Sequence, residues 1–239
     1  MPNRLDLYSS ILDGLPAELA ETIRAHAHVV RSRRGNDVVS LGDSSVQVYL
    51  LLEGRAQTRL VTQDGSDAIL RDLGPGDFFG ELAAIDSEPR SAWVVALSDC
   101  VLARIPGETF HDTVTRIPAV AAWMEKRLTA QIRDLTHRWF ELNALQVRSR
   151  LHCELARMCG KADEAVTIDP APTHAELAAR IGTHREAITR EIGYLVRNGM
   201  IEQERRRLTI RDPVALRRLA DMATGGVEAD PRQGSAAAP

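Results

Sequence analysis

The sequence predicts an α+β protein: a jelly-roll-like β-roll, a long helix, and a C-terminal winged helix-turn-helix. Three observations support this fold class. Between residues 29 and 106, short runs rich in Val, Leu and Ile are separated by glycine-containing turns, which is typical of an all-β roll and not of βαβ units. Residues 119–144 contain neither Gly nor Pro and carry apolar residues at helical spacing. Residues 173–201 contain two helix-start signals ten residues apart.

The composition restricts the class of protein. A chain of 239 residues suits two domains, and 44% hydrophobic with 26% charged residues is ordinary for a globular protein. No apolar run reaches the roughly 18 to 20 residues of a membrane helix, so neither a disordered chain nor a membrane-spanning protein is expected. The N-terminus lacks the pattern of an export signal, and Cys100, Cys153 and Cys159 lack metal-ligand spacing. We therefore expect a cytoplasmic protein without a metal and without a membrane partner.

The net charge of −3 is unevenly distributed along the chain. Residues 1–146 hold 15 Lys and Arg against 20 Asp and Glu, net −5. Residues 147–223 hold 14 against 11, net +3, and residues 224–239 hold one against two, net −1. This asymmetry indicates an acidic module joined to a module that faces an anion.

Four segments are expected in order. Residues 1–118 form the β-roll domain, which opens with a short helical stretch whose start lies near Pro16. Residues 119–146 form the long helix, and residues 147–223 form the helical domain. Residues 224–239 have the small and polar composition of a disordered tail.

The long helix carries an apolar stripe. Leu128, Leu135 and Leu142 are seven residues apart, and Ile132, Trp139 and Leu145 lie alongside them. Two interpretations are open: the stripe packs on its own domain, or it pairs with a second copy of the chain. Its position between two domains favours a dimerisation helix.

The centre of the C-terminal domain has helix-turn-helix spacing. Thr173 and Glu176 have the spacing of a capping box, Thr183 and Glu186 repeat it, and Gly182 lies between the two predicted helices. Asn198-Gly199 predicts a left-handed C-cap. The predicted inward faces consist of Leu177, Ile181, Ile188, Ile192 and Leu195.

The second of these helices has a polar face suited to DNA bases. Arginine donates two hydrogen bonds to guanine, and a carboxylate accepts one from cytosine. The alternative is a solvated surface with a Glu186–Arg190 pair; the caps and the turn glycine favour DNA. Residues 200–212 predict a strand, a turn and a strand, where residues 205–207 are three arginines that either contact phosphates or lie in a solvated turn. The candidate DNA-binding residues are Thr173, His184, Arg185, Glu186, Thr189 and Arg190.

Residues 78–96 contain a candidate anion pocket. Gly80-Glu81 precedes Arg90-Ser91 by ten residues. Glycine permits close approach of a ligand to the backbone, and a helical turn beginning there points N–H groups at an anion. Arg90 offers a planar fork of donors to a phosphate, and Ser91 adds a hydroxyl. Because a carboxylate only accepts hydrogen bonds, Glu81 suits a sugar hydroxyl. One pocket would thus hold a phosphate and a ribose.

Together these motifs resemble the cyclic-AMP receptor protein/FNR family of bacterial transcription regulators. FGEL…PRSAWV is similar to its phosphate-binding cassette and THREAITREI to its recognition helix, and the resemblance covers residues 8 to 223. It implies a cyclic-nucleotide site made by Gly80, Glu81, Leu82, Arg90, Ser91 and Ala92, with purine contacts on the long helix at Leu135, Thr136 and His137. The resemblance favours cAMP as effector. The cyclic-AMP pattern has two hydroxyl residues where this chain has Leu-Thr, so cGMP stays open, and Thr136 would contact the purine with His137 or Arg133 as helper.

The resemblance also implies partners: a second copy in a homodimer, double-stranded DNA with a palindromic, TGTGA-like operator, and RNA polymerase. A regulator of the same architecture that needs no ligand, or senses a haem-bound gas through His26, His28 or His111, is an alternative. No Cys precedes Cys100, so an iron–sulfur cluster is not expected. No catalytic arrangement supports a nucleotide-processing enzyme, and no enzyme is expected.

Overall fold

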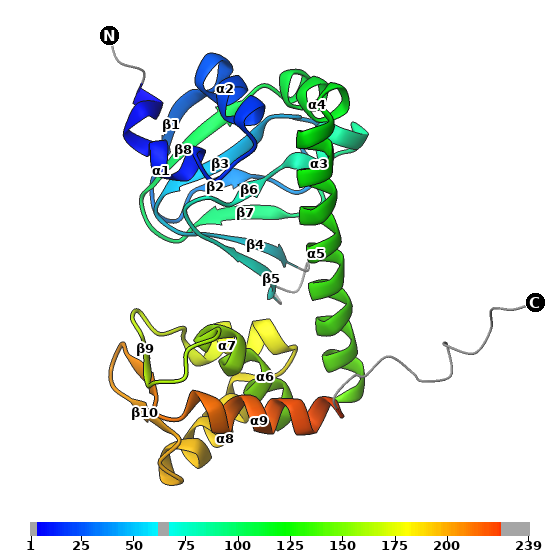
Figure 1. Cartoon of the computed structure of the whole chain (residues 1–239). Helices are drawn as coiled ribbons and strands as arrows, with labels where there is room; N and C mark the ends of the chain where they lie inside the picture. Colours follow the sequence, from blue (N-terminus) through cyan, green and yellow to red (C-terminus); the bar gives the residue numbers. More distant parts are fainter. Residues whose placement is uncertain (1–3, 62–66, 226–239) are drawn as a thin grey trace, which may run out of the picture. The chain divides into compact units, whose positions relative to one another are not determined.

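The computed structural model describes residues 4–61 and 67–225, in two compact units that are described separately, Met1–Arg133 and Asp134–Pro239 (Figure 1). The long helix α5 (Pro118–Ala144) belongs in part to each unit. It confirms the single helix predicted for residues 119–144. The predicted domain limits stay predictions.

The first unit is built on two antiparallel four-stranded sheets. One has the strand order β1 (His28–Ser32), β8 (Cys100–Ile105), β3 (Val48–Glu53), β6 (Phe78–Phe79). The other has the order β2 (Asp37–Val39), β7 (Trp93–Ala96), β4 (Ala56–Val61), β5 (Asp67–Leu73). This confirms the predicted β-roll.

Strand β3 shows why the sheets stack. Its side chains alternate between two apolar clusters, because neighbouring residues of a strand point to opposite faces. Leu51 packs between the two sheets, whereas Leu50 and Leu52 pack against helices. A strand buried on both faces is a near-continuous apolar run, as in VYLLL.

The helices of the first unit cover the outer face of the first sheet (Figure 1). They are a short 3₁₀ segment η1 (Arg4–Tyr8), α1 (Ser9–Leu12), α2 (Ala17–His26), α4 (Gly107–Arg116) and the start of α5. The predicted helical entry is confirmed with Pro16 as the N-cap of α2, although it is divided into two helices. A further helix, α3 (Glu81–Asp86), follows β6 directly.

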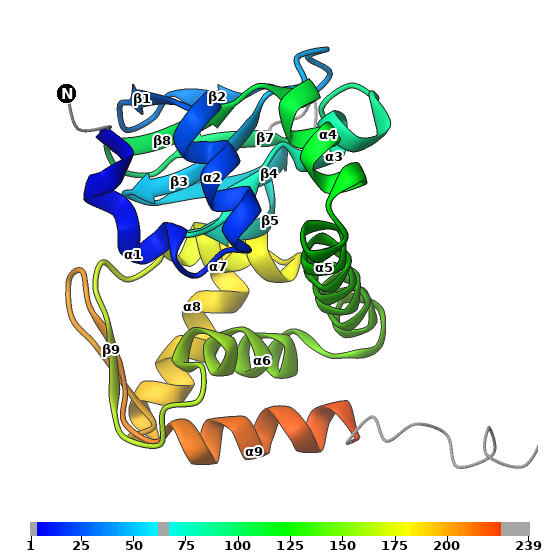
Figure 2. The same cartoon turned by 45° about the horizontal axis from the view of Figure 1, so that its top comes forward.

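In its described residues, the second unit combines the end of α5 and further helices with a small sheet. Helices α6 (Val147–Cys159) and α9 (Pro213–Thr224) lie side by side (Figures 1 and 2). Helices α7 (His174–Ile181) and α8 (Arg185–Arg197) form the helix-turn-helix. The sheet has the order β10 (Ile201–Gln203), β11 (Leu208–Ile210), β9 (Val166–Ile168), so β10 and β11 confirm the predicted strand–turn–strand. All five predicted inward residues are buried: Leu177, Ile181, Ile188, Ile192 and Leu195.

One of the two predicted capping boxes is wrong. Thr173 and Glu176 form the first box, but α8 begins at Arg185, and its N-cap His184 makes no side-chain cap. The reason lies in the turn, where Gly182 adopts φ +60° and the Thr183 N–H donates to the Ala178 carbonyl at 3.0 Å. Thr183 thus completes the end of α7 and is not available to begin α8.

Of the other predicted features, the cap after α8 lies within the described residues, and most of the tail lies outside them. Gly199, at φ +68°, confirms the left-handed cap after α8. Thr224 ends α9, and residues 226–239 of the predicted tail lie outside the described residues. Among the described residues, no helix has the length and hydropathy needed to cross a bilayer. The same part of the chain contains no group of three His, Cys, Asp or Glu side chains able to hold a metal.

Candidate anion pocket and nucleic-acid interface

Arg90 is held in place by oxygen atoms of the protein. It precedes β7 and is only 3% exposed. Its Nη1 donates to the Gly80 carbonyl at 2.7 Å and its Nη2 to the Gln47 carbonyl at 2.6 Å. Nε and Nη2 each lie 3.4 Å from the Ser45 hydroxyl. The plane of the guanidinium is therefore fixed before any ligand arrives.

The charge of Arg90 is not neutralised by an ion pair. No carboxylate of the described residues comes within 4.0 Å of its guanidinium. Burial lowers the pKa of Arg90, and the nearby charges of Tyr49, Asp43 and Glu81 oppose that change. Arginine still keeps its proton, because a guanidinium is not deprotonated in proteins. A buried cation held by neutral oxygens favours an anion beside it.

Gly80 is required by the same geometry. It adopts φ +82° and is the N-cap of α3. A Cβ atom at this position would lie 2.5 Å from Arg90 Nη1 and 2.9 Å from the Gln47 carbonyl oxygen. Any side chain here would be strained and would displace the guanidinium.

Glu81 provides the acceptor of the pocket. It is the first residue of α3 and is 5% exposed, and its carboxylate makes no hydrogen bond or ion pair within the described chain. Its charge raises the pKa of both Arg90 and Arg127, so it lies near both cations. A buried carboxylate without a donor favours hydroxyl groups of a ligand.

The structure brings together Gly80, Glu81 and Arg90, as predicted from their spacing. Ala92 is buried, at 8% exposure, whereas Ser91 and Leu82 are exposed, with Leu82 at 45%. The three predicted purine contacts, Leu135, Thr136 and His137, are exposed on α5 and belong to the second unit. Their role in the pocket stays a prediction.

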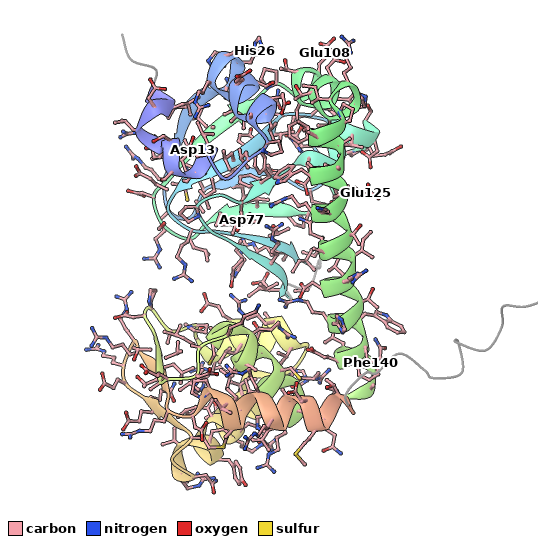
Figure 3. The ribbon with its side chains drawn as sticks, in the orientation of Figure 1. Asp13, His26, Asp77, Glu108, Glu125 and Phe140 are labelled. Atoms are coloured by element: carbon pink, nitrogen blue, oxygen red, sulfur yellow. The ribbon has the colours of Figure 1, made fainter. Side chains whose placement is uncertain are left out.

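Arg127 was not found by sequence analysis. It lies on α5, and its Nη2 donates to the Phe78 carbonyl at 3.1 Å and lies 3.5 Å from the Asp77 carboxylate, labelled in Figure 3. Its guanidinium also lies over the rings of Phe78 and Trp123, 5.6 and 5.8 Å from their centroids. Helix α5 is thus attached to the strand that leads into Gly80. Nothing in the local sequence pairs an arginine with a loop 50 residues earlier.

The reading face of α8 is unpartnered. Arg185, Glu186 and Arg190 are exposed, and none makes a side-chain hydrogen bond or ion pair with another described residue. The Glu186–Arg190 pair of the alternative interpretation does not form. Ile188 and Ile192, on the opposite face, are buried. The arginines are free to contact an external acceptor.

The remaining DNA-binding candidates have structural contacts of their own. The Thr173 hydroxyl accepts the Glu176 N–H at 3.1 Å, and the Thr189 hydroxyl donates to the Arg185 carbonyl at 3.0 Å. His184 is exposed. The three arginines of the β10–β11 turn are exposed, and Arg207 is paired with Asp169 at 2.8 Å.

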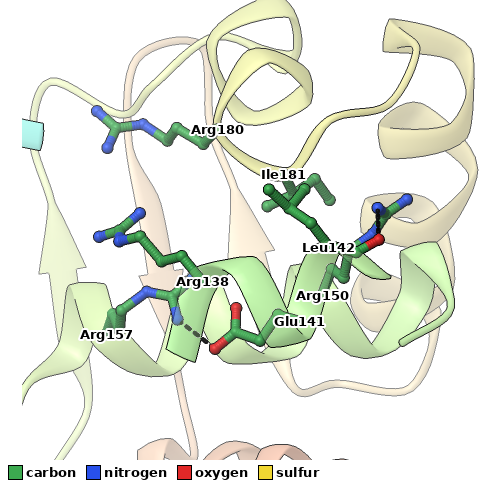
Figure 4. A pocket seen from close by; sticks show the side chains of 7 residues that line it. All are labelled: Arg138, Glu141, Leu142, Arg150, Arg157, Arg180 and Ile181. Atoms are coloured by element: carbon green, nitrogen blue, oxygen red, sulfur yellow. Dashed lines mark hydrogen bonds and ion pairs between the residues drawn. The ribbon is translucent and has the colours of Figure 1, made fainter. Parts of the chain in front are cut away.

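In the second unit, buried carboxylates hold arginines that are partly buried, in contrast to Arg90. Glu154, 2% exposed, contacts Arg157 at 2.8 Å, Arg180 at 3.3 Å and Arg138 at 3.6 Å. Arg157 also donates to Glu141 at 2.6 Å, as Figure 4 shows. We call these five residues the Arg–Glu cluster; it connects the end of α5 with α6 and α7.

The alternative sensors lack supporting geometry. His26, labelled in Figure 3, and His28 are exposed, and His111 Nδ1 lies 3.1 Å from the Ala84 carbonyl. The three cysteines are unpaired and buried. Burial raises the pKa of all three thiols, that of Cys153 to about 11, so none is a reactive thiolate.

A β-roll with a buried cation and an open carboxylate, followed by a winged helix-turn-helix with unpartnered arginines, defines a class: ligand-sensing DNA-binding regulators. Comparison with known proteins agrees. Residues 29–116 match the description of a cyclic nucleotide-binding domain, and residues 149–219 match a Crp-like helix-turn-helix domain.

Similar proteins include characterised regulators. The chain is 25% identical over 188 residues to the cAMP-activated global transcriptional regulator Vfr of Pseudomonas aeruginosa, covering 76% of this chain and 88% of that protein. It is 25% identical over 214 residues to the cyclic AMP receptor protein of Thermus thermophilus, covering 89% and 97%. The solved structure of the c-di-GMP-responsive regulator CLP of Xanthomonas campestris matches with a TM-score of 0.71 and 22% identity, covering 82% of this chain and 99% of that one.

This chain belongs to the cyclic-AMP receptor protein/FNR family of transcription regulators. The fold class and the resemblance predicted from sequence are confirmed. Because this is a family of transcription regulators and not of enzymes, the prediction that the chain is not an enzyme is confirmed as well.

Proposed function

We propose that this regulator is a cytoplasmic homodimer that binds a cyclic nucleotide, cAMP in preference to cGMP, and then a palindromic duplex with TGTGA-like half-sites. RNA polymerase is the proposed partner on DNA. One observation carries the ligand assignment: buried Arg90 has no carboxylate partner and lies beside buried, unpartnered Glu81.

The two groups suit two parts of one ligand. A cyclic phosphate carries a single negative charge and accepts the charge-assisted hydrogen bonds that a fixed guanidinium donates. A ribose hydroxyl donates to the Glu81 carboxylate. Since Arg90 also binds the Gly80 and Gln47 carbonyls, a phosphate shares or takes over donors that already hold two segments together.

The preference for cAMP is a proposal of the same kind. Relatives that cover most of the chain are named as cAMP-activated regulators. In the proposed site, Thr136 and His137 supply the polar contacts to the purine, and Leu135 supplies apolar surface. We propose that the site needs no metal ion, since Arg90 and Glu81 supply the donors and the acceptor for the phosphate and the ribose.

The dimer is proposed from the surface of α5. Ile132, Leu135, Trp139 and Leu142 are 63, 52, 67 and 43% exposed in the single chain, whereas Leu128 packs against the core of the first unit. A second copy would cover this stripe and give two recognition helices for successive major grooves. Switching needs little energy, because a tenfold preference of the ligand for the DNA-competent arrangement is about 1.4 kcal/mol.

The test is calorimetric titration of the full chain with cAMP and with cGMP, with and without a TGTGA-containing duplex. Arg90→Ala is expected to weaken cAMP binding by about 2–5 kcal/mol, because the buried phosphate loses its cation. Gly80→Ala is expected to weaken it as well, by displacing Arg90. Arg104→Ala, an exposed arginine of β8, is the matched control.

Unchanged binding heat in Arg90→Ala would remove the pocket assignment. A second candidate function is a regulator of the same architecture that needs no ligand, and the bonds by which Arg90 already joins Gly80 and Gln47 favour it. That candidate predicts no heat with either nucleotide and unchanged binding to the duplex.

A further inference from the structure

His174 connects the three elements that carry the DNA-facing residues. It is the first residue of α7, and its Nδ1 lies 2.9 Å from the Thr189 hydroxyl on α8. Its Nε2 lies 2.9 Å from the side-chain nitrogen of Gln203, the last residue of β10. One imidazole therefore contacts both the recognition helix α8 and the wing, which is the hairpin of β10 and β11.

Taken together, the three contacts around His174 and Thr189 favour one tautomer of the imidazole. The Thr189 hydroxyl has a single hydrogen, which it donates to the Arg185 carbonyl at 3.0 Å. Its contact with His174 is then satisfied only if Nδ1–H donates to the hydroxyl oxygen. Nε2 is left as an acceptor, and the Gln203 amide donates to it. One tautomer satisfies all three contacts, in a directed chain from the wing to the backbone of α8.

This arrangement changes the part that Thr189 plays. Its hydroxyl donates within the helix and accepts from His174, so its donor is not available to a base. Arg185 and Arg190 remain without partners in the described chain. The reading atoms are the arginines, and the threonine connects their helix to its support.

His174 is not a core residue of the second unit. It is partly exposed and lies outside the buried cluster that stabilises this unit. The start of α7 is fixed independently by the Thr173–Glu176 capping box. Loss of the imidazole should therefore change the position of α8 and the wing without unfolding the unit.

We propose that His174, through Thr189 and Gln203, is a positioning residue for base discrimination: it holds α8 and the wing in the one arrangement in which Arg185 and Arg190 meet base edges. The proposal rests on the proposed DNA-binding function and deepens it. The network contains three hydrogen bonds, two of them made by His174. Their contribution to free energy is large enough to alter base discrimination and too small to decide folding.

The first experiment measures base discrimination by the full chain. Wild type is used to select its preferred duplex from a randomised pool, in the presence of cAMP, and affinities are then measured for that duplex and its single base-pair variants. His174→Ala and Thr189→Val are each expected to reduce the ratio of preferred to variant affinity by about three- to tenfold. The double variant is expected to lose no more than either single one, because the two residues act as one unit.

Two further variants test the role of hydrogen bonding. His174→Asn keeps a donor near the position of Nδ1 and is expected to restore part of the discrimination, and Gln203→Met breaks only the contact with the wing. Thr167→Val is the matched control, since the Thr167 hydroxyl pairs with the Thr209 hydroxyl at 3.0 Å in the same sheet and not with His174, Thr189 or Gln203. Thermal unfolding of each variant separates a loss of positioning from a loss of fold.

The second experiment reads the tautomer directly, by nitrogen chemical shifts of ¹⁵N-histidine-labelled protein without DNA. Protonated Nδ1 and unprotonated Nε2 in His174 are expected. Protonation at Nε2, additive losses in the double variant, or an equal loss of affinity on every duplex would each overturn the proposal. Failure of wild type to select any sequence would instead contradict the proposed function, while the tautomer would still report on the network.

Discussion

Arginine is used in opposite ways in the two units. In the first, Arg90 is 3% exposed and its donors are occupied by the oxygens of Gly80, Gln47 and Ser45. In the second, Arg185 and Arg190 are exposed and make no side-chain hydrogen bond or ion pair with other described residues. The pocket residue is fixed in advance for one small anion, whereas the residues of the reading face keep their donors for an outside surface.

The comparison teaches what each kind of ligand requires. A small ligand offers few contacts, so affinity depends on a site that loses little freedom on binding and is already desolvated. DNA offers many phosphates and base edges, and long solvated side chains adjust to them. The Arg–Glu cluster is a third case, in which partly buried arginines are neutralised by buried carboxylates of the same unit.

The largest effect is expected when the Arg–Glu cluster loses Glu154, the more buried of its two carboxylates. Glu154→Ala removes the buried carboxylate that Arg157 and Arg180 share, and the Arg180 side chain is only 8% exposed, so the change should destabilise the second unit by about 3–5 kcal/mol. Scanning calorimetry should show the transition of that unit shifted to lower temperature. Cyclic-nucleotide binding by Arg90 should change little.

Asp134→Ala provides the control for this prediction. Asp134 pairs with Arg138 at 2.8 Å but is 49% exposed, so its loss should cost less than about 1 kcal/mol. An equal shift in both variants would mean that burial of the charge does not distinguish the two pairs.

A smaller effect is expected on the reading face. Arg185→Ala or Arg190→Ala should reduce discrimination at one base pair by about 1–3 kcal/mol, with no change in thermal stability, because neither side chain has an internal partner. Affinity for the duplex should fall steeply with salt, and cAMP affinity much less. Equal salt dependence of both ligands would contradict the contrast between a buried and a solvated cation.

The smallest effect concerns pH and the second unit alone. Burial lowers the pKa of His152 below its usual 6.5, the charge of Arg148 lowers it further, and that of Glu191 opposes both. The folded unit therefore favours neutral His152, and above pH 6.5 protonation of this residue does not reduce the free energy of unfolding. As pH falls below that value, the unfolded chain binds a proton that the folded chain does not, so stability decreases until the folded pKa is reached.

Calorimetry across this range should show the decline in wild type, and His152→Gln should remove this contribution. The pocket provides the contrast, because Arg90 does not titrate between pH 5 and 8. A decline of the same size in His152→Gln would assign it to another group.

Residues 78–92 and 173–192 show what can and cannot be predicted from the spacing of residues in the sequence. Gly80, Glu81 and Arg90 come together as expected. Arg90 follows Gly80 by only ten residues, and a short helix capped by the glycine limits how the chain between them can fold. The second capping box was wrong at Thr183. Sequence spacing does not show that the Thr183 N–H already donates to the Ala178 carbonyl at the end of α7. Ser45, Gln47 and Arg127 were missed because they reach the pocket region from segments far along the chain.

The sequence by itself determined the order of β-roll, long helix and winged helix-turn-helix, and which residue types could meet a phosphate, a ribose and a base. These follow from periodicity, turn residues and side-chain chemistry, all of which are local. Only the tertiary structure decided what each polar group is bound to: Arg90 to carbonyls, the partly buried arginines of the second unit to Glu154, and Thr189 to His174, while the Arg185 side chain has no hydrogen-bond or ion-pair partner in the described chain. Hydrogen-bond partners depend on which groups the fold brings within about 3 Å of one another, and the spacing of residues in the sequence does not show this.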